Sequence, residues 1–163
     1  MITKTMQEAI NNQINKEMSS SYLYLSMAAY FEEKHLSGFA HWMRLQTNEE
    51  NQHAMKFYDF LVERGGRVSL GAIAAPKGDW TNSLEAFHQV LEHEEMISAS
   101  INELYELAQK EKDYPTQILL QWFISEQVEE EKNAADIIQQ LKMIDAHDTA
   151  VLLLDKQLGK RGG

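Results

Sequence analysis

Residues that break helices are confined to a few places in this chain of 163 residues. It contains two prolines and eight glycines, and most of them lie between residues 65 and 78 or near the C-terminus. The remaining long stretches are compatible with helix. We therefore expect an all-α protein with four long helices and one short helix.

Local signals place the ends of these helices. The long helices are predicted at about residues 5–33, 37–64, 82–112 and 114–146, and a short apolar helix is predicted at about residues 147–158. Ser37, Asn82 and Asp113 belong to residue types that cap helix N-termini, and Gly65 suits the end of the second helix. All of this is expected to form one domain over residues 1–163, with the bundle at about residues 5–146.

The lengths of the connections predict how the helices are joined. Only a few residues separate the first helix from the second and the third from the fourth, so each pair must form an antiparallel hairpin. Residues 65–81 could extend to about 56 Å, which exceeds the ~42 Å length of the second helix. The predicted fold is thus an up-down-down-up four-helix bundle with one long crossover and a short fifth C-terminal helix. That fifth helix could pack across its own bundle end or line a contact with symmetry mates.

Composition excludes several kinds of site and partner. The chain has no cysteine, so disulfides, thiolate metal sites and a cysteine nucleophile are excluded, and a transition metal would need His, Asp and Glu ligands. A net charge of -10 argues against binding to nucleic acid or to an anionic membrane. No leader-like segment or apolar run of about 18 residues is present, which favours a cytoplasmic location.

The apolar stripe of every long helix is interrupted by a carboxylate. Read at steps of three and four residues, the four stripes contain Glu17, then Glu50 with His53, then Glu94, and finally Glu130. Burial of an unpaired carboxylate is costly. Four helices that each place one on the inward face therefore predict a compensating cation.

These polar residues are expected to lie at one level of the bundle. Two residues of an antiparallel hairpin lie side by side when they are equally far from the turn. Residues 17 and 53 are centred on position 35, and residues 94 and 130 are centred on position 112, which are both predicted turns. An offset of 77 residues also relates the two hairpins, and it pairs Glu17, Glu50 and His53 with Glu94, Gln127 and Glu130.

The residue types in this layer indicate a pair of iron ions. One ion would bind Glu17, Glu50 and His53. The other would bind Glu50, Glu94 and Glu130, so that Glu50 bridges the two. Four carboxylates offset the charge of two divalent ions, and oxygen-rich ligation suits iron that shuttles between the ferrous and ferric states. A buried layer of salt bridges is the bland alternative, but Lys and Arg are absent from these inward levels.

The polar pattern resembles the ferritin family, and closely the non-haem bacterial ferritins, over essentially the whole chain. Ferritin-like proteins are themselves an established example of a bundle with a two-metal carboxylate site, so this match is a recognition of that family. The resemblance implies a ferroxidase that oxidises ferrous iron with oxygen or hydrogen peroxide. It also implies a ferric oxide store inside a hollow homo-oligomeric shell of twenty-four chains, and contacts between fifth helices around a four-fold axis.

The resemblance further assigns residues around the paired site. Tyr24 would lie beside it, Glu49, Glu126 and Glu129 would form a third iron site that faces the cavity, and Gln127 is a further candidate ligand. Without the resemblance, the three acids would be interpreted as a solvated face and Tyr24 as a core aromatic residue.

Departures from related families narrow the prediction. Bacterioferritins carry a second Glu-x-x-His, where this chain has Gln127 and Glu130, so the site is asymmetric. Their haem-ligating methionine corresponds to Gln52, and an amide is a poor axial ligand, so no haem is expected. The DNA-binding mini-ferritins lack a fifth C-terminal helix, and the LLLDKQL segment argues against them.

Two other functions are compatible with a layer of buried acids. The first is a di-iron peroxidase or oxidase of the rubrerythrin type. Such a protein would have an appended electron-transfer domain or a substrate cavity, and this chain has no cysteine-ligated rubredoxin segment. The second is a structural or regulatory bundle whose acids bind no metal, in which case added ferrous ion should not raise the melting temperature.

Overall fold

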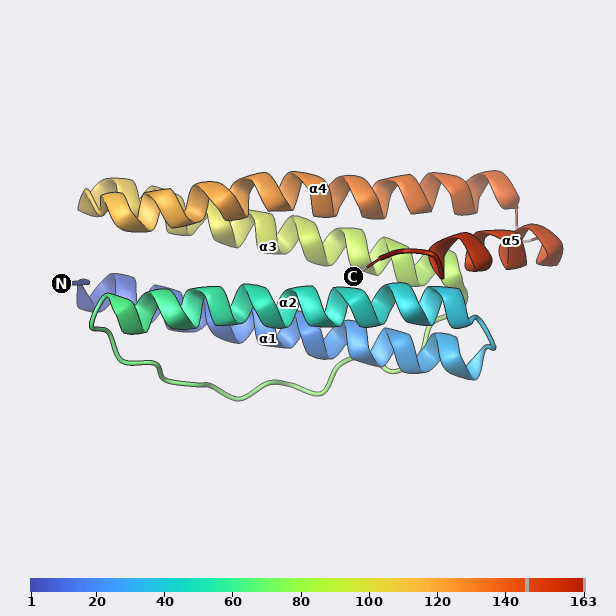
Figure 1. Ribbon diagram of the computed structural model, residues 1–163, viewed down its shortest axis with the longest axis horizontal. Coiled ribbons are helices and arrows are strands. Elements are labelled where there is room, and N and C mark those ends of the chain that lie inside the picture. The colour runs from blue at the N-terminus through green and yellow to red at the C-terminus, as the bar shows by residue number, and fades with distance from the viewer. Residues whose placement is uncertain (146, 163) are drawn as a thin grey trace.

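Helices α1 to α5 make up the regular structure of the residues that the computed structural model describes, which are 1–145 and 147–162. They are α1 (Lys4–Glu33), α2 (Ser37–Glu63), α3 (Ser83–Glu111), α4 (Tyr114–Ile144) and α5 (Asp148–Leu158) (Figure 1). The predicted boundaries agree to within two residues. The predicted end of the fourth helix at Ala146 lies outside the described residues.

The predicted connectivity of the bundle is confirmed. α1 and α2 form one antiparallel hairpin, α3 and α4 form another, and the crossover at residues 64–82 runs the length of the first hairpin (Figure 1). Side chains of α1 hold this irregular segment: Asn11 donates to the Arg67 carbonyl at 2.9 Å, and Ser26 donates to the Lys77 carbonyl at 2.7 Å. These bonds satisfy backbone groups that no helix pairs. The crossover is thus a fixed strap along α1.

Most helix ends carry the predicted caps. The Asn82 side chain accepts from the Glu85 amide, and the Asp113 side chain accepts from the Thr116 amide. Gly65 follows the end of α2 with a φ of 71°, which is the left-handed conformation that glycine tolerates best.

The predicted cap at the start of α2 is wrong. Ser37 is already helical, and the N-cap residue, Leu36, makes no side-chain cap bond. Asp155 of α5 supplies the missing acceptor, because its Oδ1 accepts from the amides of Gly38 and Phe39 at 2.8 and 2.9 Å. The fifth helix therefore packs against the end of its own bundle, and its carboxylate offsets the positive end of the α2 dipole.

Two apolar clusters fill the bundle, and the predicted polar layer separates them. The cluster toward α5 includes Phe31, Phe39 and Phe87, and the cluster toward the opposite end includes Phe57 and Phe123. The buried polar residues between them include Glu17, Gln46, Glu50, His53, Glu94, Gln127 and Glu130. Apolar packing on both sides keeps bulk water away from these carboxyl groups, so their charges must be balanced locally. No helix within the described residues has the length and hydropathy that a membrane span requires.

Candidate metal centre

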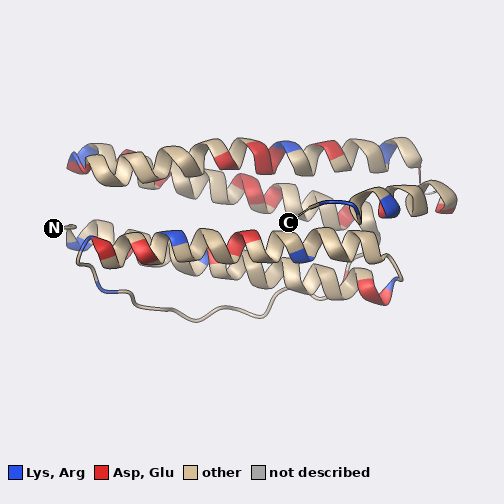
Figure 2. Ribbon diagram, viewed as in Figure 1, with Lys and Arg blue, Asp and Glu red and all other residues tan. Residues whose placement is uncertain are grey.

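Four helices bring the predicted ligands to the middle of the bundle. Glu17 comes from α1, Glu50 and His53 from α2, Glu94 from α3 and Glu130 from α4, and all five side chains are buried. Figure 2 shows acidic segments of α2, α3 and α4 at the same level along the bundle. Helical spacing within each hairpin accounts for this alignment, as the sequence predicts.

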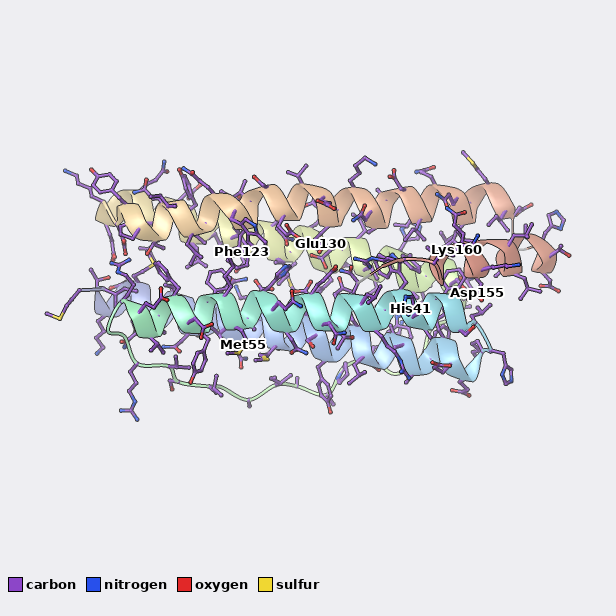
Figure 3. All side chains as sticks on the ribbon, in the orientation of Figure 1. His41, Met55, Phe123, Glu130, Asp155 and Lys160 are labelled. Carbon is purple, nitrogen blue, oxygen red and sulfur yellow. The ribbon has the colours of Figure 1, made fainter. Side chains whose placement is uncertain are left out.

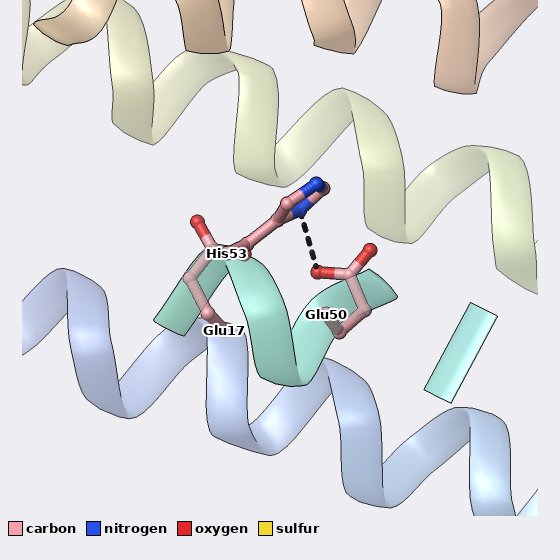
Figure 4. A group of neighbouring side chains, drawn as sticks. All are labelled: Glu17, Glu50 and His53. Carbon is pink, nitrogen blue, oxygen red and sulfur yellow. Dashed lines mark ion pairs between the residues drawn. The ribbon is translucent and has the colours of Figure 1, made fainter. Parts of the chain in front are cut away.

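Three of these residues form a compact group. One ligand atom each from Glu17, Glu50 and His53 lies within 4.8 Å of the others, and Figure 4 shows Glu17 on α1 with Glu50 and His53 on α2. The His53 Nδ1 atom lies 3.5 Å from Glu50 Oε2. Glu17 Oε2 and Glu50 Oε1 are buried and accept no hydrogen bond from any described residue. Two unsatisfied carboxylate oxygens beside an imidazole nitrogen are a donor set that suits a divalent transition metal.

A second group adjoins the first and differs from the predicted one. It consists of His53, Glu126 and Glu130, again with ligand atoms within 4.8 Å, and His53 Nε2 lies 4.0 Å from Glu126 Oε1. Glu50, Glu94 and Glu130 do not form such a group within residues 1–145 and 147–162. His53 thus belongs to both groups, whereas the sequence pattern predicts that Glu50 is the bridging residue.

Hydrogen bonds explain why Glu94 belongs to neither of the two ligand groups. Its Oε1 accepts from the Tyr24 hydroxyl, and its Oε2 accepts from the Gln127 amide at 3.0 Å. Tyr24 is fully buried, and it lies beside the centre as the resemblance implies. Gln127 faces Glu94 as a hydrogen-bond donor, so its amide group orients the carboxylate in this structure.

Burial dominates the electrostatics of the carboxyl groups. It raises the pKa of Glu17 to about 7 and that of Glu130 to about 8, and the negative charge of Glu94 adds to both shifts. Burial, followed by the charges of Glu94 and Glu17, holds the pKa of Glu50 well above its ordinary value of 4.5. Without a metal ion the group therefore retains protons at neutral pH. A bound cation would displace them, because it favours the charged carboxylates.

His53 is held in the form that binds metal ions. Burial lowers its pKa to about 4, and the charge of Lys56 adds to this effect, so the imidazole is neutral at pH 7. Its ring lies edge-on to Trp122 and Phe123, with centroid separations of 5.5 and 5.7 Å. Aromatic packing fixes the ring between the two carboxylate groups.

Residues outside the predicted set also orient the ligands. Gln13 donates to Glu17 Oε1 at 2.7 Å, and Ser100 donates to Gln13 Oε1 at 2.6 Å. Lys16 donates to Ser100 at 2.6 Å, so a chain of polar contacts leads from the surface to Glu17. Gln13 precedes Glu17 by four residues on the same helical face, and this spacing is a signal that sequence reasoning could have used.

A basic residue also lies against the layer, although Lys and Arg are absent from the inward helical positions. Arg161 follows α5 and donates to Gln46 Oε1 at 2.7 Å and to Glu49 Oε2 at 2.8 Å. Gln46 in turn donates to Glu130 Oε2 at 2.9 Å. The helical stripes could not reveal Arg161, because it comes from a segment outside the four long helices.

The three acids of the implied third site lie on the surface side of the layer. Glu49 and Glu126 are half-buried and line a pocket of about 470 Å³ that also includes His53 and Trp122, whereas Glu129 is exposed. Burial raises the pKa of Glu126, and the charges of Glu129 and Glu49 add to the shift. In the part of the chain that the structure describes, these three acids do not form a three-ligand group. The pocket leads from the surface to His53.

Comparison with known proteins places this architecture in a well-populated group. Residues 7–144 match the family model described as Ferritin, a ferritin-like domain. The chain is 44% identical to the bacterial non-heme ferritin of Bacteroides fragilis (strain 638R) over 161 residues, covering 99% of this chain and 100% of that protein. It is 37% identical to that of Staphylococcus aureus (strain NCTC 8325 / PS 47), covering 99% and 97%.

Solved structures agree with the sequence comparison. An open pore ferritin from the hyperthermophilic archaeon Archaeoglobus fulgidus superimposes with a TM-score of 0.98 at 50% identity, covering 99% of this chain and 100% of that one. An engineered closed form of the same archaeal ferritin also gives a TM-score of 0.98 at 50% identity, covering 99% of each chain.

Proposed function

This chain belongs to the ferritin family, and we propose that it is a ferroxidase that stores the iron it oxidises. Ferrous iron is the substrate. It binds in the buried layer, is oxidised there by oxygen or hydrogen peroxide, and passes as ferric ion into a mineral store.

The two unsatisfied oxygens of the first group carry this proposal. Glu17 Oε2 and Glu50 Oε1 are buried, and no described residue donates to them. A carboxylate oxygen in such a place costs several kcal/mol unless a proton or a cation compensates it. The neutral imidazole of His53 3.5 Å from Glu50 completes a donor set for a divalent ion.

Oxidation follows from the charge of the ligands. Each ferrous ion gives up one electron, so two ions supply the two electrons that reduce oxygen to hydrogen peroxide or hydrogen peroxide to water, with protons taken from solvent. Hard carboxylate oxygens stabilise the ferric ion more than the ferrous ion, which favours electron release. We assign the first ion to Glu17, Glu50 and His53, and the second to Glu50, Glu94 and Glu130, because the charges of Glu94 and Glu130 both act on the carboxyl group of Glu50.

Assembly and storage rest on the family. Relatives across essentially the full chain length are named ferritins, and we propose that this chain likewise forms a hollow shell of twenty-four copies. Glu49, Glu126 and Glu129 would then form a third iron site that leads ferric ions from the paired site toward the cavity. We also propose a cytoplasmic location for this store.

An aerobic titration of metal-free protein with ferrous iron tests the proposal. Ferric absorbance is followed against the iron added per chain. We expect fast oxidation with a break near two irons per chain, followed by slower continued turnover. Oxidation no faster than in buffer would refute the assignment.

Substitutions at single residues test whether iron oxidation takes place in the buried polar layer. Glu50→Ala should abolish the fast phase, because it removes a ligand from the first group, and it should leave the assembly intact. Glu95→Ala is the matched control, because Glu95 is an exposed glutamate next to Glu94 on α3. Unchanged initial rates in Glu50→Ala would place oxidation elsewhere.

A further inference from the structure

The chain turns back after α5 and reaches the metal centre. We call residues 159–162 the C-terminal arm. The arm runs from the end of α5 along α2 toward the middle of the bundle (Figure 1), and its two basic residues lie above α2 (Figure 2). The His41 ring nitrogen lies 2.8 Å from the Arg161 carbonyl oxygen, which ties the arm to α2.

The start of the arm is fixed by close packing of α5. Asp155 caps α2 through the amides of Gly38 and Phe39. A Cβ atom at Gly38 would lie 1.7 Å from the Asp155 carbonyl oxygen, so only glycine permits this approach. Figure 3 shows Asp155 and Lys160 at the same end of the bundle as His41, with Glu130 nearer its middle. The arm therefore extends from a rigid anchor toward Glu130.

The Arg161 guanidinium group makes two hydrogen bonds to one face of α2. It donates to Gln46 at 2.7 Å and to Glu49 at 2.8 Å, and it lies 4.9 Å from the centre of the Trp42 ring. Gln46 and Glu49 are three residues apart and share a helical face. A planar group with fixed donors can bond both at once, whereas a lysine offers a single point charge.

Arg161 thereby determines which way the Gln46 amide points. Gln46 is fully buried, and its Oε1 accepts from Arg161 while its Nε2 donates to Glu130 Oε2 at 2.9 Å. A side-chain amide has one acceptor end and one donor end. An amide reversed by 180° would place its oxygen against the Glu130 carboxyl group and its nitrogen against the guanidinium group. The arginine thus holds the donor toward Glu130.

Arg161 also forms an ion pair with an acid that lines the surface pocket. Its partner Glu49 lines the pocket of about 470 Å³ together with Glu126 and His53. The Arg161 and Glu49 side chains are 23% and 33% exposed, so the ion pair is partly shielded from water and can still be displaced. A divalent ion that binds Glu49 through Oε2 must replace this internal cation.

We propose that Arg161 is a tethered cation that orients Gln46 toward Glu130 and competes with a further divalent ion for Glu49. This inference rests on the proposed function, because its consequence is that the protein binds the first two ions in preference to a third. Substitution of Arg161 should change the metal affinities of the two kinds of site in opposite directions. Binding that involves Glu130 should weaken, and binding that involves Glu49 should strengthen.

Zinc binding to the assembled, metal-free protein tests this without any redox step. Calorimetric titration with Zn²⁺ alone resolves the tighter ions from the weakest one. In Arg161→Gln we expect the weakest site to bind about three- to ten-fold more tightly and the tighter sites to bind about two- to five-fold more weakly. Arg161→Lys should lie between this variant and the wild type, because it keeps the charge and loses the double contact.

Two controls separate positioning from a general structural effect. Lys160→Gln removes the same charge from the adjacent exposed residue of the arm, and its affinities should stay within about two-fold of the wild type. Glu49→Gln, added to Arg161→Gln, should cancel the gain at the weakest site. Equal changes in the two arm variants, or weakening at every site, would overturn the proposal.

The iron titration distinguishes failure of the proposed role of Arg161 from failure of the proposed ferroxidase activity. A wild-type protein that oxidises iron while Arg161→Gln leaves zinc binding unchanged would refute the role of the arm alone. A protein that shows the opposite-sign zinc changes and does not oxidise iron would refute the ferroxidase alone.

Discussion

Replacing Glu50 with glutamine should stabilise the metal-free protein and at the same time abolish much of its stabilisation by metal. Glu50 is buried, its Oε1 accepts no hydrogen bond from a described residue, and burial with the charges of Glu94 and Glu17 holds its pKa well above 4.5. Glutamine has nearly the same shape and carries no charge at any pH. The substitution therefore removes the ionisation cost without opening a cavity.

The magnitude follows from proton linkage. A folded-state pKa above the unfolded value favours folding fully below pH 4.5, and this contribution is lost as the pH rises toward the folded pKa. Each pH unit between 4.5 and the folded-state pKa costs about 1.4 kcal/mol. Glutamine avoids this cost, and Glu50→Gln should recover on the order of 1 to 3 kcal/mol at pH 7, which is the typical cost of one uncompensated buried polar group, and little at pH 4.5. For a chain of this size that corresponds to a rise in Tm of roughly 2 to 12 °C.

Differential scanning calorimetry of metal-free protein between pH 4.5 and pH 8 measures this directly. The wild type should lose stability with rising pH more steeply than the variant. Addition of Zn²⁺ at about one hundred times its Kd should add about 2.7 kcal/mol per site to the wild type and clearly less to the variant. Glu95→Gln, which removes an exposed charge beside Glu94, should follow the wild type in both respects.

Two results would refute the reasoning about Glu50. A metal-free variant that is less stable than the wild type at pH 7 would mean that the carboxyl group stabilises the fold without a metal ion. An undiminished zinc effect in the variant would mean that Glu50 is not a ligand.

Three further predictions concern the same layer and its anchor. Zn²⁺ added to metal-free protein at pH 6.5 should release protons from carboxyl groups such as Glu130, whose pKa burial raises to about 8, and fewer protons should be released at pH 9. Calorimetry in buffers of different ionisation enthalpy measures the number of protons released, and a number that does not change with pH would contradict the prediction. Tyr24→Phe removes the hydroxyl donor to Glu94 and should cost about 1 to 2 kcal/mol of stability at pH 7, whereas an unchanged denaturation midpoint would show that the bond contributes nothing. Gly38→Ala places a methyl group 1.7 Å from the Asp155 carbonyl oxygen and should lower the free energy of unfolding by about 1 to 3 kcal/mol; circular dichroism should still show a helical bundle, and an unchanged Tm would show that α5 does not seat there.

Much of the architecture is visible in the sequence because it depends on local spacing. The 3.6-residue period identifies the inward face of each long helix, so the sequence alone assigns Glu17, Glu50 and His53 to the core. The short turns also determine the two hairpins, so the number of residues between a position and its turn predicts the level of that position along the bundle. The crossover length then leaves the up-down-down-up arrangement as the favoured one.

The detailed arrangement of the metal centre depends on contacts between helices, which residue spacing along the sequence does not predict. Glu130 lies with His53 and Glu126, and its Oε2 accepts from Gln46, and both contacts depend on packing between α2 and α4. The pairing of Glu94 with Tyr24 and Gln127 arises in the same way. The sequence pattern therefore predicts which polar residues are buried in the layer, whereas the second group in the structure consists of His53, Glu126 and Glu130.

The largest difference concerns the residues after α4. The sequence by itself determined the helices, their order and the polar layer, because helix registry and turn length are properties of neighbouring residues. Only the tertiary structure decided that Asp155 caps α2 and that Arg161 contacts Gln46 and Glu49. Those contacts join residues more than one hundred positions apart, and they form only when the packing of α5 against α2 brings the two segments together.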